Sequence, residues 1–247
     1  MSGALQWCEF IFFFNFKDNG GYAIMSNDTR LGPLLAITET GQLKKDSVIN
    51  NPGFILFLEY TDASYNVLAK QGIPNHRIKD SIVYSPWSEE YIDLPEGPCK
   101  VQWGQGYPYN NYTPVIENDG HIADISRTLA HFGYSSCGQE VDYSYDAILS
   151  EIRQGAPVLV SGSDLYKKHY VLGFEVSTDY RGYCWLIDGA KELIRTMTDY
   201  SIYGKVEGIS YEKKYYLHCN FGWSGNFDGY YYDGVFNHLK LITGIRK

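Results

Sequence analysis

The stretch LHCNFGWSGNFDGYYYDGVF, Leu217–Phe236, decides the fold because two strand-like runs enclose a turn-like segment. The first run belongs to a predicted strand over Tyr215–Asn220, and the second predicts a strand over Gly229–Tyr232. Aromatic residues favour strands, whereas the Gly, Asn and Asp residues between the runs favour a turn. The pattern predicts a β-hairpin, and we therefore expect an antiparallel sheet.

The residues before this hairpin predict three further strands of the sheet and two helices. Three further strands are predicted over Pro157–Val160, Tyr170–Val176 and Tyr183–Ile187. Apolar residues at helical spacing predict a helix over His121–Phe132, and a second short helix is expected over Tyr145–Arg153.

The first third of the chain predicts a compact α/β unit. Its strands are expected over Phe10–Phe16, Tyr22–Ser26 and Leu34–Thr38. Pro52 then opens a helix that carries Phe54, Phe57 and Leu58 on one face.

An irregular stretch separates the two parts. Between Pro74 and Pro98 the chain mixes Pro, Ser, Trp and acidic residues, which is typical of a linker. We place the domain boundary here, with one unit over residues 1–97 and a second over 98–247. The expected fold class is α+β.

Composition excludes several classes of function. The net charge of −8 and the scattered Lys and Arg residues provide no basic stripe for nucleic acid. The five cysteines are odd in number and far apart, so they predict neither a disulfide framework nor a zinc site. No metal or cofactor is expected.

The N-terminal stretch MSGALQWCEFIFFFNF has an apolar run without the features of a signal peptide. It has no basic start and no small-residue cleavage site, and Glu9 interrupts the approach to the run. The run is too short to span a membrane, so we expect no membrane insertion. The compartment stays open.

Four stretches of the second part, in this order and spacing, resemble the streptopain family of bacterial papain-like cysteine peptidases. They are WGQGYPYNNYTPVIE (Trp103–Glu117), GAPVLVSG (Gly155–Gly162), YCWLIDGA (Tyr183–Ala190) and the Leu217–Phe236 stretch. The resemblance implies a papain-like domain with an antiparallel sheet. The family is secreted or periplasmic.

The first part resembles the inhibitory prodomain of the same family. The matching stretches are GGYAIMSNDTRLGPLLAITETGQL (Gly20–Leu43) and NPGFILFLEY (Asn51–Tyr60). The resemblance therefore implies a prodomain-like α/β unit that precedes a truncated papain-like domain.

The resemblance also implies a remnant of a catalytic site. Gln105 stands where the family places its oxyanion donor, and Asn220 and Trp223 stand where it orients the histidine. As alternatives, Asn220 is a turn former and Trp223 a core aromatic residue. Tyr183 occupies the histidine position, and a phenol with an ordinary pKa of about 10 cannot replace imidazole near neutrality.

The resemblance implies that the segment that carries the nucleophile in the family is absent here. Thr113–Gly120 runs directly into His121–Ser136, which resembles a helix and turn that lie beyond the nucleophile helix in the family. Loss of the nucleophile and its base predicts no measurable peptide hydrolysis.

The leading hypothesis is an inactive peptidase homologue that binds a polypeptide or inhibits an active cysteine peptidase. A second hypothesis is an active peptidase with a displaced pair, Cys137 and His169. A third is a glycan-binding surface built from Phe227–Tyr232 and the loop near Trp87, and a decayed gene product is the fourth. The insertion between Asp188 and Tyr215 is a candidate cover for the sheet face that the lost segment would expose.

Overall fold

The computed structural model describes most of the chain, and the structural statements below concern those residues. They are 5–6, 10–28, 30–44, 48–72, 81–94, 129–130, 133–163, 170–176, 182–222, 225–236 and 238–246.

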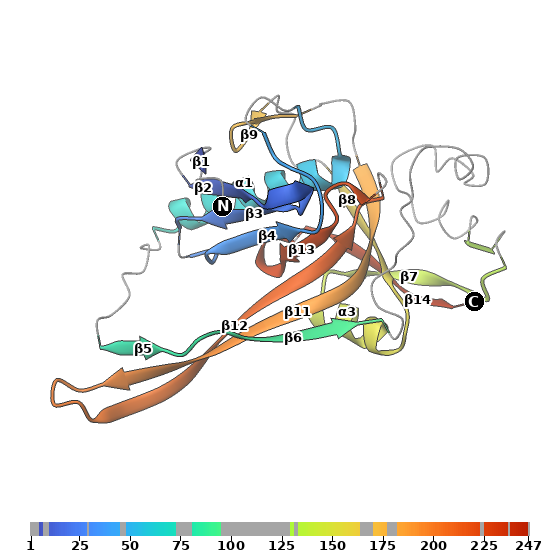
Figure 1. The fold of residues 1–247 in the computed structure, drawn as a ribbon. Coiled ribbons are helices and arrows are strands. Elements are labelled where there is room, and N and C mark those ends of the chain that lie inside the picture. The colour runs from blue at the N-terminus through green and yellow to red at the C-terminus, as the bar shows by residue number, and fades with distance from the viewer. Residues whose placement is uncertain are drawn as a thin grey trace.

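One antiparallel sheet of twelve strands runs through the described residues (Figure 1). Its N-terminal strands are β1 (Leu5–Gln6), β2 (Ile11–Asn15), β3 (Tyr22–Ser26), β4 (Leu34–Thr38), β5 (Ile82–Tyr84) and β6 (Ser88–Asp93). The others are β7 (Ser136–Asp142), β8 (Val158–Ser163), β11 (Gly182–Tyr200), β12 (Val206–Asn220), β13 (Gly229–Tyr232) and β14 (Lys240–Arg246). The order across the sheet is β1-β2-β3-β4-β13-β12-β11-β8-β14-β7, and β5 and β6 both pair with β11. With its helices, this makes the α+β class that the sequence predicts.

Several predicted elements have the bounds that the sequence predicts, and others differ. β3, β4, β13 and the helix α3 (Tyr145–Arg153) agree residue for residue. The predicted strand Tyr170–Val176 is instead a small hairpin of β9 (Tyr170–Val171) and β10 (Phe174–Glu175). The predicted helix His121–Phe132 lies outside the described residues, apart from 129–130.

Helix α1 (Pro52–Lys70) is the central buried element. Asn51 accepts the Phe54 N–H at its start, and Pro52 follows at the first helical position, where no N–H is needed. Every residue from Gly53 to Thr61 is buried, so the helix is covered around most of its circumference in its first half. The sequence predicts one apolar face over Phe54, Phe57 and Leu58, whereas the structure buries residues on all sides of this half of the helix.

The N-terminal and C-terminal parts share one sheet and one hydrophobic core. β4 pairs with β13, and the Phe57 ring of α1 packs edge-on against Tyr231 of β13 at 4.7 Å. Both rings belong to a single cluster of buried residues that also includes Ile24 and Leu241. The division at 97/98 stays a prediction, because residues 95–128 lie outside the described part.

The stretch expected to be an irregular linker contains two strands. β5 and β6 lie along β11, which with β12 continues well beyond the rest of the sheet as a long ribbon (Figure 1). We call this ribbon the arm and define it as residues 191–215 with β5 and Ser88–Tyr91. The insertion between Asp188 and Tyr215 is thus an extension of two strands, and it projects from the sheet rather than covering it. No described helix is long and apolar enough to cross a membrane.

Candidate functional site

Tyr183 lies at the start of β11, next to the turn that follows β12. Its hydroxyl donates a hydrogen bond to the Phe221 carbonyl at 2.5 Å, and its ring stacks near Trp185. Phe221 is buried against Gly53, and a Cβ at that glycine would lie 2.1 Å from the Phe221 ring. The hydroxyl of Tyr183, at the predicted histidine position, is thus hydrogen-bonded to a turn that packs tightly against α1.

Asn220, at the end of β12, has a turn-forming contact. Its side chain is buried, and Oδ1 accepts the Gly222 N–H at 3.0 Å. Gly222 has a φ of 75°, a left-handed conformation that favours glycine. This contact supports the turn-forming interpretation. Three other predicted site residues, Gln105, Trp223 and His169, lie outside the described residues.

An irregularity in the β11–β12 pairing aims Asp188 at His218. Ile187 pairs with Cys219 and Gly189 pairs with His218, so Asp188 is an extra residue on β11, as in a β-bulge. The Asp188 carboxylate is fully buried, and its Oδ1 lies 2.5 Å from His218 Nδ1.

The glycine after the bulge provides the space for this pair. At Gly189 a Cβ would lie 3.2 Å from the His218 Cβ and 2.8 Å from an Asp93 carboxylate oxygen. Any larger residue would push the histidine or Asp93 away.

The opposite side of His218 faces the N-terminal part of the chain. Glu39, just after β4, places Oε1 at 3.3 Å from His218 Nε2, an ion-pair distance without the alignment of a hydrogen bond. The Tyr230 ring packs edge-on against the imidazole at 5.0 Å. His218 therefore lies between two carboxylates that come from distant parts of the sequence.

Electrostatics keep this histidine charged. Burial lowers the pKa of His218, but Asp188 and Glu39 together outweigh burial and raise the pKa to about 9. The histidine in turn holds the pKa of Glu39 below its usual value. Near neutrality the imidazole is thus a cation whose two nitrogens both face carboxylates, and it has no lone pair with which to act as a base.

Asp228 adds a second unusual carboxyl group to the cluster. Burial raises its pKa to about 7, although a hydrogen bond from the Phe221 N–H opposes this, as does the charge of His218. We refer to Asp188, His218 and Asp228, together with the exposed Glu39, as the buried charge cluster, named for its three buried members.

Comparison with known proteins identifies the scaffold. The sequence model of the Peptidase C10 family matches residues 125–231, which include Tyr183, Asp188, His218 and Asn220. A solved structure of a fragment of Prevotella intermedia prointerpain A, in a cysteine-to-alanine mutant, superposes with a TM-score of 0.56 and 16% identity. The superposition covers 99% of this chain and 98% of that structure. No curated protein matches the chain by sequence.

Residues 125–231 of this chain are therefore similar to the C10 peptidases. The sheet and helices of the chain match the papain-like fold of that structural neighbour, which confirms the predicted fold class.

Three cysteines lie among the described residues, and burial disfavours the thiolate at two of them. Burial raises the pKa of Cys184, and it raises that of Cys219 well above the usual value. Cys219 is next to His218 in sequence but lies in the hydrophobic core, as strand alternation predicts. Cys137 lies on β7 opposite Ile245 of β14. Its predicted pairing with His169 stays untested.

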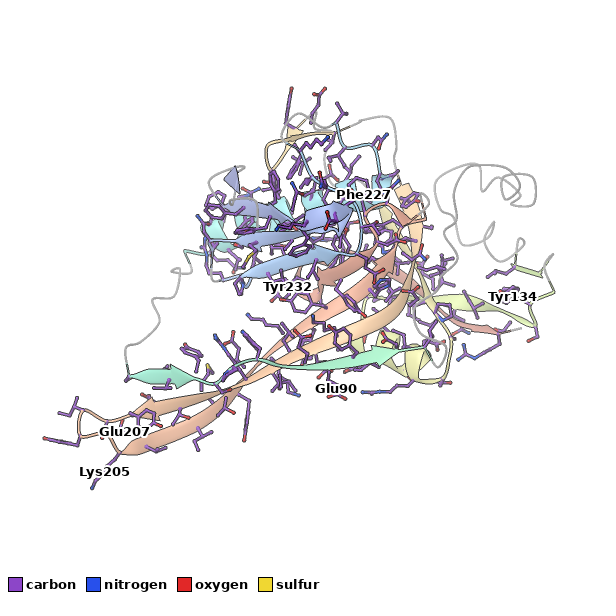
Figure 2. The ribbon with its side chains drawn as sticks, in the orientation of Figure 1. Glu90, Tyr134, Lys205, Glu207, Phe227 and Tyr232 are labelled. Atoms are coloured by element: carbon purple, nitrogen blue, oxygen red, sulfur yellow. The ribbon has the colours of Figure 1, made fainter. Side chains whose placement is uncertain are left out.

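The aromatic run proposed as a glycan platform is divided between several environments. Tyr231 is fully buried, and Phe227 stacks on Phe54 of α1 at 4.8 Å (Figure 2). Tyr232 packs against Tyr216, while Tyr230 contacts His218. Most of these ring faces are occupied by protein.

Sequence reasoning missed the buried charge cluster. It indicated only that His218 and Cys219, adjacent on a strand, point to opposite faces, and it assigned no role to Glu39, Asp188 or Asp228. The available signal was the DG dipeptide at 188–189, directly after the predicted strand Tyr183–Ile187, because Gly within a strand often marks a bulge.

Proposed function

We propose that this C10 relative does not hydrolyse peptides and acts by binding another polypeptide, with an active cysteine peptidase as its partner. The observation that carries the proposal is the hydrogen bond from the Tyr183 hydroxyl to the Phe221 carbonyl, at the position that the sequence resemblance assigns to the family's histidine. A phenol in this contact offers no base that could activate a thiol near neutrality.

The state of His218 supports the same proposal. His218 lies on β12, two residues before Asn220. Asp188 and Glu39 raise its pKa, so that it is a buried cation near neutrality. A general base must be able to accept a proton at working pH, and a group with a pKa of about 9 is already protonated. His218 is therefore not a substitute for the absent imidazole.

Hydrolysis is tested with the purified chain on casein and on fluorogenic peptides, alongside an active C10 peptidase. We expect no turnover from the wild type. Tyr183→His should also be inactive, because on our proposal the chain lacks the nucleophile segment as well as the base. Activity of the wild type that a thiol-directed epoxide abolishes would overturn the proposal.

Binding is tested by titrating this chain into a constant amount of the active C10 peptidase. We expect peptidase activity to fall as a complex of standard interface size forms, roughly 1,600 Å² in total. Serum albumin at the same concentration is the control for non-specific protection. Unchanged peptidase activity at a large excess, with no complex in gel filtration, would rule out a peptidase as partner.

A further inference from the structure

The arm carries an unusual share of the apolar surface among the described residues. Of the large hydrophobic side chains that are exposed, more than half lie on it: Val83, Tyr91, Ile202, Tyr203, Val206, Ile209 and Tyr211. One face is held together by Arg195, which lies over the rings of Tyr84 and Trp87 and pairs with Glu212. The opposite face presents Val83, Ile209 and Tyr211 to solvent.

One long edge of the arm has no strand partner in the described chain. β12 pairs with β11 along its length, whereas β13 covers only Tyr216–Cys219 on the other side. Residues 206–215 therefore leave main-chain groups unpaired along an edge. Proteins normally protect such edges because another strand can add to them.

The pairing pattern identifies which residues point to this edge. Thr196 accepts a hydrogen bond from the Ser85 N–H and donates one to the Ser85 hydroxyl, so its main chain faces β5. The neighbours of Thr196 on β11 then face β12, where they meet Ser210 and Glu212. Alternation directs the main-chain groups of Ile209, Tyr211 and Lys213 outward, and those of Tyr215 after them.

We propose that this edge pairs with the same edge of a second copy of the chain. The two copies are antiparallel about a twofold axis at Ser210, and the two arms form one continuous sheet. In this register Ile209 lies opposite Tyr211 of the second copy, a pair that occurs twice. Glu207 is the extra residue where the β11–β12 register shifts, and it comes next to Lys213 of the second copy, again twice. Aromatic with β-branched pairs and opposite charges are both favourable across antiparallel strands.

Neighbouring registers lack this complementarity. Placing Ile209 opposite itself sets Lys205 against Lys213, a repulsive pair. Placing Tyr211 opposite itself leaves neither Glu207 nor Lys213 with an opposite charge. The sequence of β12 therefore favours one self-pairing register.

The net charge of the β12 edge does not oppose pairing between two copies of the chain. The chain has a net charge of −8, but residues 205–215 contain three lysines and two glutamates, which gives the segment a net charge of +1. Figure 2 shows Lys205 and Glu207 at the outer end of the arm, far from the body of the molecule. The two bodies can therefore remain apart while the arms pair, which limits repulsion between them. The ladder is short, so we expect a weak, concentration-dependent dimer.

A charge exchange on the full-length chain tests the register. Sedimentation equilibrium is run from roughly 1 to 300 μM, a range that resolves dissociation constants in the micromolar region. We expect Lys213→Glu and Glu207→Lys each to raise the dimer dissociation constant by about tenfold or more, since each replaces two attractive pairs with two repulsive ones. The double variant E207K/K213E should return to within about threefold of the wild type, because it restores both pairs in reverse.

Lys70→Glu, an exposed charge reversal at the end of α1, is the matched control and should leave the constant unchanged. A wild type that stays monomeric throughout the range would overturn the proposal. So would a double variant that associates as weakly as the single variants.

A cysteine at the proposed twofold axis gives a second, geometric readout. Ser210 lies opposite itself as a non-hydrogen-bonded pair, whose Cα separation of about 4.5 Å suits a disulfide. Ser210→Cys should yield a covalent dimer under mild oxidation. Gly208→Cys is the control, because that position has open space but lies opposite Glu212 of the second copy. Equal cross-linking of both variants would contradict the register.

Discussion

At the residue scale, Tyr183 links β11 to the turn after β12 through its hydroxyl group. Removing that hydroxyl leaves the Phe221 carbonyl without this donor. We expect Tyr183→Phe to lower the free energy of unfolding by about 1 kcal/mol, the usual net value of one hydrogen bond in a protein. Urea denaturation measures the change, with exposed Tyr203→Phe as the control. Equal stability of the two variants would mean that the hydrogen bond contributes nothing.

His218 gives a pH dependence whose sign follows from its raised pKa. The folded-state pKa of about 9 exceeds the ordinary value of 6.5, so the folded protein binds the proton more tightly. The resulting stability is fully present below pH 6.5 and is lost as the pH rises through 9. The groups that face the imidazole are Asp188, Glu39, Asp228 and Tyr230.

We therefore expect the free energy of unfolding to fall by up to about 3 kcal/mol between pH 6.5 and 9.5. His218→Gln should be less stable at neutral pH and should lack most of this slope. His238→Gln, which changes an exposed histidine, should keep it. Urea titrations at several pH values give the slopes, and a wild type with a flat profile would contradict the charged state of His218.

Asp228 also makes the folded protein less stable as the pH rises, but over a lower pH range than His218. Its pKa is raised to about 7 by burial, so the stability it contributes as a neutral acid is present below about pH 4 and is lost as the pH rises through 7. Stability thus falls with rising pH across both windows. Glu39 is more than a hundred residues from Asp188 and Asp228 in the sequence, and even these two are 40 residues apart, which is why sequence patterns could not bring them together.

At the element scale, Gly53 decides how closely α1 approaches the turn after β12. In an exposed helix interior, Gly→Ala is worth roughly 1 kcal/mol of added stability. Here the new methyl group would lie 2.1 Å from the Phe221 ring, and overpacking of this kind costs typically 1–3 kcal/mol, occasionally more. We expect Gly53→Ala to be destabilising overall, whereas exposed Asn66→Ala should change little. A stabilised Gly53→Ala variant would show that the turn moves freely.

Elements whose local pattern agreed with their environment were predictable from sequence. β3, β4, β13 and α3 have both the expected type and the expected bounds, because alternation, turn residues and the Ser144 cap mark their ends. The length of β11 and β12 was not predictable, since beyond Leu193 on β11 and before Tyr216 on β12 their residues face solvent to varying degrees and lose a periodic signal. The strands β5 and β6 form only because β11 provides an edge for them.

Some features of the candidate site were likewise predictable from local sequence, and others were not. The position of Tyr183 at the start of a strand and the turn at Asn220 follow from local sequence. The bulge at Asp188 depends on how two strands are registered, and the contact of Glu39 with His218 depends on the packing of the N-terminal part against β13. Such long-range contacts are not encoded in a local pattern.

At the scale of the whole molecule, a shared core predicts cooperative unfolding. The buried cluster includes residues of α1, β2, β8, β11, β13 and β14. We expect far-ultraviolet circular dichroism and tryptophan fluorescence to report one coincident urea transition. Two separate transitions would mean that the N-terminal part folds as an independent domain. Val83→Ser, on the arm, serves as the control and should leave the midpoint nearly unchanged.

The position of β4 between β3 and β13 has a consequence for proteolytic maturation. In a zymogen whose propeptide merely covers the enzyme, one cut releases the propeptide. Here a protease that cut the backbone between α1 and β5 would release no fragment. β4 is hydrogen-bonded to β13 within the sheet, and most of the first half of α1 is buried. The two pieces would remain associated as a nicked heterodimer, and only denaturant would separate them.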